Sequence, residues 1–284
     1  MKIKILLTLC IFSFFLYKNS SSQVSGLGKK DRLTTTVEKV PTSIKTNLNC
    51  LPNDPIYTSG GVVTEAEKFA ISMAGVKVSA EEESDFGDDA FNEMKSSGNY
   101  QFITSGEQYN ALLVMLSDLL KTRRNPSGIR YKIHLIKNNE VNAYTLGGHI
   151  FVNTGIIDFA NSESALAAIV GHEIGHNEKG HINLLLKKIK LGNSFMGGFG
   201  DIGLALQQTI TPFFNQKNEV EVDAYGADLC QAAGYDSRKG MELWKKMAES
   251  EGKKNMIESF LRSHPYSNDR YDCLKKHIET NYKF

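Results

Sequence analysis

The pattern of apolar and polar positions along the chain is mainly helical. In residues 107–123, five leucines recur at the spacing of one helix face. The same spacing, with polar residues that suit helix starts, predicts further helices. These are expected at residues 64–74, at 163–190, from near 218 onward, and, as two or three helices, at 238–284. Residues 81–89 are acidic and polar, which predicts a solvated turn and the start of a helix.

Two strands are predicted ahead of the long helix. Residues 131–137 alternate, with three apolar side chains on one face. A second strand is expected at residues 149–153, after the turn-forming pair Gly147-Gly148. Two strands followed by a dominant helical half predict an α+β fold that is mainly helical.

The first 22 residues differ from the rest of the chain. Two lysines precede an apolar run at residues 5–17, and three serines follow it. This layout predicts a secretory signal peptide at residues 1–22, with an uncleaved N-terminal anchor as the alternative. Residues 23–60 are polar and lack sustained periodicity, which predicts a flexible linker. The folded domain is then expected at residues 61–284.

Composition narrows the choice of partners and compartment. The chain has 33 basic and 32 acidic residues and shows no basic stripe with interleaved aromatics, so nothing indicates nucleic acid. Cys50, Cys230 and Cys273 remain after the predicted cleavage, and their spacing fits no zinc finger. In an oxidising compartment two of them would pair, most simply Cys230 with Cys273, although the sequence does not assign the pair.

An apolar stretch at residues 195–214 raises the question of a membrane span. It contains Asp201, Pro212 and four glycines, and a central aspartate is costly in lipid. The stretch is therefore interpreted as an apolar flap close to the functional site. The glycine-rich residues 192–203 are expected to be mobile.

The motif His172-Glu173-Ile174-Gly175-His176 carries the chemistry. At about 100° per residue, His172 and His176 lie within roughly 40° of each other on one helix face and can bind one metal ion. Glu173 lies beside that face, where it can take a proton from a water on the metal. The alternative is a solvated face of an amphipathic helix.

A catalytic zinc ion needs a third protein ligand. His181 is nearby, but in a continuing helix it would point about 140° away from His176, which favours packing or hydrogen bonding over metal binding. Glu219 and Asp223 share one face of a later helix, whereas Glu221 points elsewhere. Glu219 is therefore the expected ligand, and Asp223 is expected to accept the free N–H of a metal-bound histidine.

These residues resemble the HtpX- and CAAX-prenyl-endopeptidase-like zinc metallopeptidases, peptidase family M48. The resemblance covers about residues 70–275, and its pieces fall in family order. They are Asn142-Ala143-Tyr144 with Gly147-Gly148, the approach Ala167-Ala168-Ile169-Val170-Gly171, Glu219-x-x-x-Asp223 with Ala233-Gly234-Tyr235-Asp236, and Ser263-His264-Pro265 with Arg270. The proline that the family places before the two glycines is absent here.

The resemblance implies a zincin-type, gluzincin-like metalloprotease domain, with a small β-sheet beside the HExxH helix. It implies one Zn²⁺ per chain, bound by His172, His176 and Glu219, with Glu173 as the general base. His264 and Arg270 would approach the site from the C-terminal helices and take part in catalysis.

Two roles are open for His264, which would either stabilise the oxyanion or occupy the open zinc position in a resting state. Asn142 and Gly148 would contact the substrate, with the strand at residues 149–153 pairing with an extended polypeptide. The remaining histidines match no family motif and are interpreted as structural: His134, His149 and His277.

The resemblance thus implies a zinc metalloendopeptidase of the compact branch exported to the periplasm or cell envelope of bacteria. Its substrates would be unfolded or misassembled proteins, in envelope protein quality control, and contact with a membrane surface is left open. One alternative is a zinc-containing, chaperone-like binding protein with little or no proteolysis. Another is an aminopeptidase-type exopeptidase, although no charged subsite for a substrate terminus is recognisable.

Overall fold

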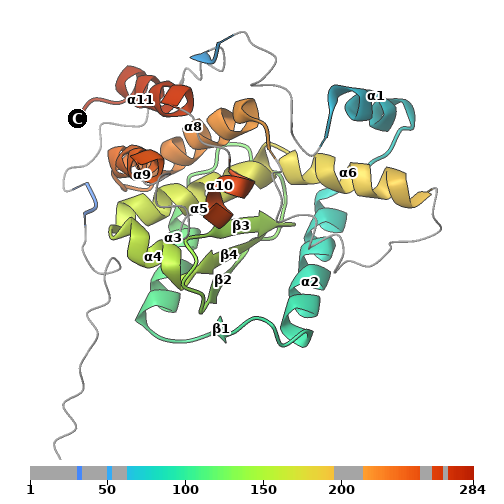
Figure 1. Ribbon diagram of the computed structural model, residues 1–284, viewed down its shortest axis with the longest axis horizontal. Helices are drawn as coiled ribbons and strands as arrows, with labels where there is room; N and C mark the ends of the chain where they lie inside the picture. Colours follow the sequence, from blue (N-terminus) through green and yellow to red (C-terminus); the bar gives the residue numbers. More distant parts are fainter. Residues whose placement is uncertain (1–30, 34–49, 53–62, 195–213, 250–257, 265–267) are drawn as a thin grey trace, which may run out of the picture.

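The computed structural model describes residues 31–33, 50–52, 63–194, 214–249, 258–264 and 268–284 (Figure 1). The predicted signal peptide and the apolar segment 195–213 lie outside the described residues, as does most of the predicted linker. The helices are α1 (Glu65–Met73), α2 (Ala80–Ser96), α3 (Glu107–Lys121), α4 (Thr154–Ala160), α5 (Glu163–Glu178), α6 (His181–Ser194), α8 (Gln216–Ala232), α9 (Ser237–Glu249), α10 (Glu258–Ser263) and α11 (Asn268–Asn281). The strands are β1 (Phe102–Ile103), β2 (Lys132–Ile136), β3 (Ala143–Leu146) and β4 (His149–Asn153).

The four strands form one mixed sheet in the order β1-β2-β4-β3. The central pair β2 and β4 is parallel, with Ile133 opposite Ile150, and the two outer pairs are antiparallel. One face of the sheet packs with α3 and α5 in the larger apolar core, and the other packs with α2 and α6 in a smaller core. The sheet therefore lies between helices, as the ribbon view shows (Figure 1).

The prediction of a mainly helical α+β fold is confirmed. Helices α1, α3 and α8, strands β2 and β4, and three C-terminal helices occur where they were expected. Strands β1 and β3 were not predicted. Both are short, with two and four residues, so neither carries a readable alternation of its own.

At residues 81–89 the predicted helix start is confirmed and the predicted solvated turn is wrong, because these residues lie inside the 17-residue helix α2, which begins at Ala80. A capping box between Ser79 and Glu82 starts the helix. Phe86, Ala90 and Met94 then recur every fourth residue and pack into the smaller core. Most acidic residues of α2 thus lie on the face of the helix opposite to these apolar side chains.

The single long helix expected at residues 163–190 is interrupted. Helix α5 ends at Glu178, and Gly180 has φ +74°, a left-handed conformation that favours glycine. The N–H of Gly180 donates to the carbonyl of Asn177, and that of Lys179 donates to Gly175. Helix α6 therefore begins at His181 in a new direction.

Helices α5 and α8 approach each other unusually closely. A Cβ at Gly226 would lie 2.7 Å from the backbone nitrogen of His172 and 3.0 Å from the carbonyl carbon of Gly171. A Cβ at Gly175 would lie 2.9 Å from Cβ of Val222. Glycine at these positions lets the two backbones touch, so residues one turn along α8 reach the side chains of α5.

The suggested pairing of Cys230 with Cys273 is wrong, because Cys273 forms a disulfide with Cys50. Cys230 is fully buried on α8 among apolar side chains of the larger core, and burial raises the pKa of its thiol. Residues 31–33 of the predicted linker also contact the domain. Arg32 binds Glu163 and Asp118, and Asp31 accepts the N–H of Ser164 in the first turn of α5.

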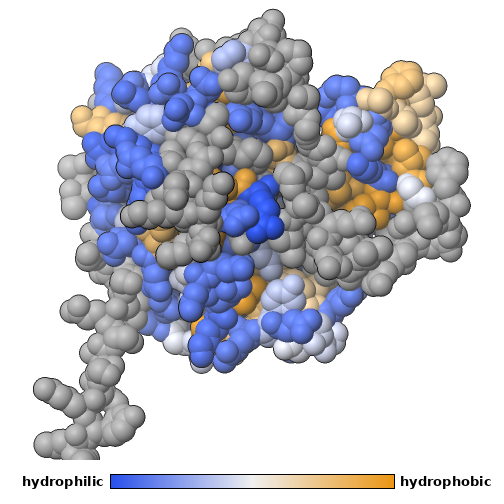
Figure 2. Space-filling model, viewed as in Figure 1, coloured by the Kyte–Doolittle hydropathy of each residue, from blue (hydrophilic) through white to orange (hydrophobic). Residues whose placement is uncertain are grey.

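Apolar surface gathers where α1 and α6 lie (Figure 2). On α1, the residues Ala66, Phe69, Ala70 and Met73 recur at helical spacing and are exposed, with Phe69 67% and Met73 73% accessible. Among the described helices, none has both the length and the apolar character that a membrane crossing requires.

Replacing Gly226 with alanine tests the contact between α5 and α8. The new methyl group meets backbone atoms that have no freedom to rotate away, so we expect a loss of about 1–3 kcal/mol in the free energy of unfolding. Denaturant unfolding measures the change. The control is Gly192→Ala on α6, where a Cβ meets nothing within 4 Å and should leave stability unchanged or slightly higher. Equal stability of the two variants would contradict the interpretation.

Glu83 on α2 makes the stability depend on pH. Its side chain is buried with Oε2 accepting from Asn183, and burial raises its pKa to about 7. Folding is thus favoured with the proton bound, and stability should fall as pH rises from about 4.5 to 7.

We therefore expect Glu83→Gln to be more stable than wild type above pH 7, by on the order of 2–3 kcal/mol, with little difference below pH 4.5. Denaturant titrations across this range give the measurement. Asp89 is exposed on the same helix. Asp89→Asn is therefore the control, and its stability relative to wild type should not change in this way with pH.

Candidate metal centre

Helix α5, which carries the HExxH motif, is enclosed on all sides. Every residue from Ser164 to Asn177 is buried, so the alternative of a solvated face on an amphipathic helix is wrong. Its N-terminus is capped by Ser162, which accepts from Ala165. Packing between the sheet and α8 fixes the direction in which the motif side chains point.

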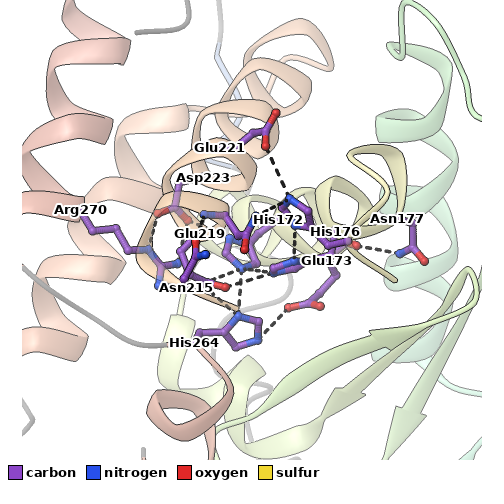
Figure 3. Close-up of polar contacts among 12 residues, drawn as sticks. His172, Glu173, His176, Asn177, Asn215, Glu219, Glu221, Asp223, His264 and Arg270 are labelled. Carbon is purple, nitrogen blue, oxygen red and sulfur yellow. Dashed lines mark hydrogen bonds and ion pairs between the residues drawn. The ribbon is translucent and has the colours of Figure 1, made fainter. Parts of the chain in front are cut away.

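Four side chains converge at the contact between α5 and α8 (Figure 3). They are His172 and His176 of α5, Glu219 of α8, and His264, which follows α10. One donor atom from each lies within 4.8 Å of all the others, and all four residues are buried. Nε2 of His172 lies 3.1 Å from Nε2 of His176 and 3.1 Å from Nδ1 of His264.

This donor set fits a metal ion. Burial lowers the pKa of His172 and that of His176, which leaves each ring neutral with a lone pair for a cation. Oε1 of Glu219 is buried without a hydrogen-bond partner among the described residues. Facing lone pairs and unpartnered buried atoms are costly unless a cation satisfies them. Three nitrogens and a carboxylate are ligands that zinc accepts.

Glu173 lies beside these donors and is not one of them. Its side chain is 1% exposed, and Oε1 has no hydrogen-bond partner within the described chain. That oxygen lies 3.4 Å from Nε2 of His264. Burial raises the pKa of the Glu173 carboxyl to about 8. A buried carboxylate held close to a metal site in this way is suited to accept and release a proton.

Asp223 and Arg270 bind residues of the donor set. Oδ1 of Asp223 lies 2.8 Å from Nδ1 of His172. Nη1 of Arg270 lies 2.8 Å from Oε2 of Glu219, and Nη2 donates to Oδ1 of Asp223 at 2.9 Å. Burial alone would raise the pKa of Asp223, but Arg270 and His172 lower it to about 2. Arg270 thus directs its charge at two carboxylates, with its guanidinium over the Trp244 ring.

The structure places His181 next to the site but outside the donor set. Its Nδ1 lies 3.1 Å from Nδ1 of His176. Glu221 points away from the donors, 3.5 Å from both His181 and Lys179. The other unassigned histidines lie elsewhere in hydrogen bonds, His134 with His149 and His277 with Asp228.

The strand that was expected to pair with substrate lies inside the sheet. Strand β4 lies between β2 and β3, so its backbone has no free edge and the expected pairing of residues 149–153 with a substrate is wrong. Gly148 forms the turn between β3 and β4, and its N–H donates to Oδ1 of Asn177 at 3.0 Å. Asn142 is buried, and its Oδ1 has no hydrogen-bond partner in the described part of the chain.

One residue near the site was missed by the sequence analysis, and another ends the apolar stretch that was expected close to it. The buried amide of Asn177 donates to Thr145 of β3 and to the carbonyl of Glu173, so it ties the motif helix to the sheet. The ring of Phe214 stacks on His176 with centroids 3.8 Å apart. Asn177 directly follows the motif, which is a usable signal, and Phe214 is the last residue of the predicted apolar flap.

The sequence of this chain is also similar to those of known metalloproteases. Peptidase family M48 matches residues 111–278. The mitochondrial metalloendopeptidase OMA1 of Schizosaccharomyces pombe is 27% identical over 211 residues, covering 68% of this chain and 60% of the relative. The metalloprotease LoiP of Escherichia coli is 24% identical over 253 residues, covering 84% and 94%.

The beta-barrel assembly-enhancing protease of Yersinia pestis is 23% identical over 220 residues, covering 70% of this chain and 44% of the relative. The chain therefore spans less than two thirds of OMA1 and of this protease, but nearly all of LoiP. The family match covers more than half of the chain and includes all four converging donors. This chain belongs to peptidase family M48.

Proposed function

We propose that the protein is a zinc-dependent endopeptidase that cleaves peptide bonds with a water activated at the metal centre. The observation that carries the proposal is the buried carboxylate of Glu173, held beside four converging metal donors and outside their set. A zinc ion there would supply Lewis acidity, lowering the pKa of a water and polarising the scissile carbonyl. Glu173 would take the proton from that water and pass it to the leaving amine.

Each remaining side chain has a proposed part. His172, His176 and Glu219 bind the metal, and His264 either stabilises the oxyanion or takes the open metal position at rest. Asp223 accepts the Nδ1–H of His172 and so fixes its tautomer. Arg270, expected to act in catalysis, is better assigned to positioning, because its guanidinium pairs with Glu219 and Asp223.

The alternative hypothesis is a zinc-containing binding protein without proteolytic activity. Four protein donors in one cluster favour it, because a structural zinc site is closed whereas a catalytic one keeps an open position. Glu173 argues against a binding protein, because a buried carboxylate oxygen without a partner is costly and a closed structural site does not need one.

Strand β3 is the proposed docking edge for substrate. It pairs with β4 on one side, and it has no second partner strand among the described residues. An extended polypeptide added there would be recognised mainly through its backbone, with Asn142 at the start of the edge. This mode suits unfolded or misassembled proteins, whose backbone is accessible.

The setting proposed for this activity is the bacterial cell envelope. Residues 1–22 are proposed as a signal peptide that directs export to the periplasm, residues 23–60 as a linker, and residues 61–284 as the peptidase domain. Similarity to a protein named as a beta-barrel assembly-enhancing protease supports a role in envelope protein quality control. The exposed apolar residues of α1 are the feature that supports contact with a membrane surface.

The variant Glu173→Gln separates the two readings. It keeps the size of the side chain but removes the base, so we expect peptide hydrolysis to fall by about 10²–10⁴-fold. Zinc content, measured by elemental analysis on the same samples, should remain one ion per chain. Undiminished hydrolysis would refute the mechanism, and absence of hydrolysis in the zinc-loaded wild type would favour the binding protein.

Backbone recognition predicts a preference for unfolded substrates. A disulfide-bonded globular protein, compared before and after reduction and alkylation, should be cleaved faster in the unfolded form. Internal cleavage should also persist when both ends of a model peptide are blocked, as read by mass spectrometry. Faster cleavage of the folded form, or a requirement for a free terminus, would contradict the docking mode and the endopeptidase assignment respectively.

A further inference from the structure

The two histidines of α5 are supported by different partners at Nδ1. In His172 this nitrogen faces the carboxylate of Asp223 at 2.8 Å. In His176 it faces another imidazole nitrogen, Nδ1 of His181, at 3.1 Å. On the other side of the His181 ring, Nε2 of His181 lies 3.5 Å from Oε2 of Glu221.

The chemistry of imidazole fixes the direction of these contacts. When Nε2 of His176 offers its lone pair to the metal centre, the proton of the neutral ring is on Nδ1. Nδ1 of His181 must then accept that proton, which leaves the proton of His181 on Nε2. Nε2 therefore donates outward, toward Glu221. The atom of Asn218 placed 3.1 Å from Nε2 is its amide nitrogen Nδ2. With the proton of His181 on Nε2, the Asn218 amide must be turned over so that its oxygen accepts, an exchange of two atoms that are nearly indistinguishable in shape.

We propose that His181 is a positioning residue for His176, and that Glu221 completes a relay in the order His176, His181, Glu221. The relay would hold the His176 ring with Nε2 directed at the metal centre, as Asp223 does for His172. It rests on the metal site of the proposed function, but it does not depend on the protein being a peptidase.

The surroundings of the relay fit this role. Phe214 stacks on the His176 ring and also approaches His181, with centroids 5.5 Å apart, which shields the hydrogen bond from water. Glu221 is half-buried and lies 3.5 Å from the ammonium group of Lys179, so its charge is balanced.

The break between α5 and α6 makes the relay possible. In one continuous helix His181 would point about 140° away from His176. The left-handed turn at Gly180 ends α5 and restarts the chain at His181, the first residue of α6. The ring is thereby turned back against the motif helix.

Amide substitutions at position 181 test the proposal, because each preserves a different half of the imidazole. In His181→Asn, the side-chain oxygen can replace Nδ1 as acceptor for His176, but the contact with Glu221 is lost. In His181→Gln, the longer amide can replace Nε2 but reaches past His176. His181→Ala removes both contacts.

The primary measurement is zinc affinity of the purified full chain, by competition with a chromophoric chelator. We expect His181→Ala and His181→Gln to lose about 10–100-fold in affinity, and His181→Asn to lose clearly less. The visible spectrum of the Co²⁺-loaded protein should change in the same order. Circular dichroism and thermal unfolding of the metal-free variants report whether the fold is intact.

Glu221→Gln tests the outer end of the relay. It should weaken zinc binding in the wild-type background but have no further effect in His181→Ala, since the connection is already broken. Equal losses for the Asn and Gln variants, or full affinity in His181→Ala, would overturn the proposal. Failure of the peptidase mechanism would instead show as hydrolysis that survives Glu173→Gln, with the order of zinc affinities unchanged.

Discussion

The metal centre depends on the close contact between α5 and α8. The donors come from both helices, and the carboxylate of Glu219 reaches His172 and His176 because glycines let the two backbones touch. A methyl group at Gly226 would push against the backbone at the first motif histidine. The small residues around the HExxH motif are therefore part of the site, although none of them carries a functional group.

Burial of so many charges in one place requires internal compensation. Glu173, Glu219, Asp223 and Arg270 are each at most 4% exposed, and isolated buried charges are very costly. Arg270 stabilises two of the three carboxylates through its two-pronged guanidinium. Glu173 is left outside that pairing, so its carboxyl is the one that burial holds near its protonated form.

The chemistry could be predicted from the sequence better than the architecture. His172 and His176 are one turn apart on α5, and Glu219 and Asp223 are one turn apart on α8, a pattern that is visible without knowledge of the fold. His264, which follows α10, was named only through the family resemblance. The strand β3, the break at Gly180 and the partner of Cys273 depend on tertiary contacts. A glycine inside a helical pattern does not by itself predict a left-handed turn. Helix α5 is buried on every side, so its sequence shows no amphipathic periodicity. On α2, acidic residues concealed three apolar positions spaced one turn apart.

The disulfide between Cys50 and Cys273 has a topological consequence. The two cysteines are 223 positions apart, so the bond closes a covalent ring around α5, α8 and the whole sheet. Within that ring, a single cut of the backbone opens the circle without producing two separate molecules. Both halves of the metal centre would thus stay covalently joined after one cleavage of the backbone between residues 50 and 273.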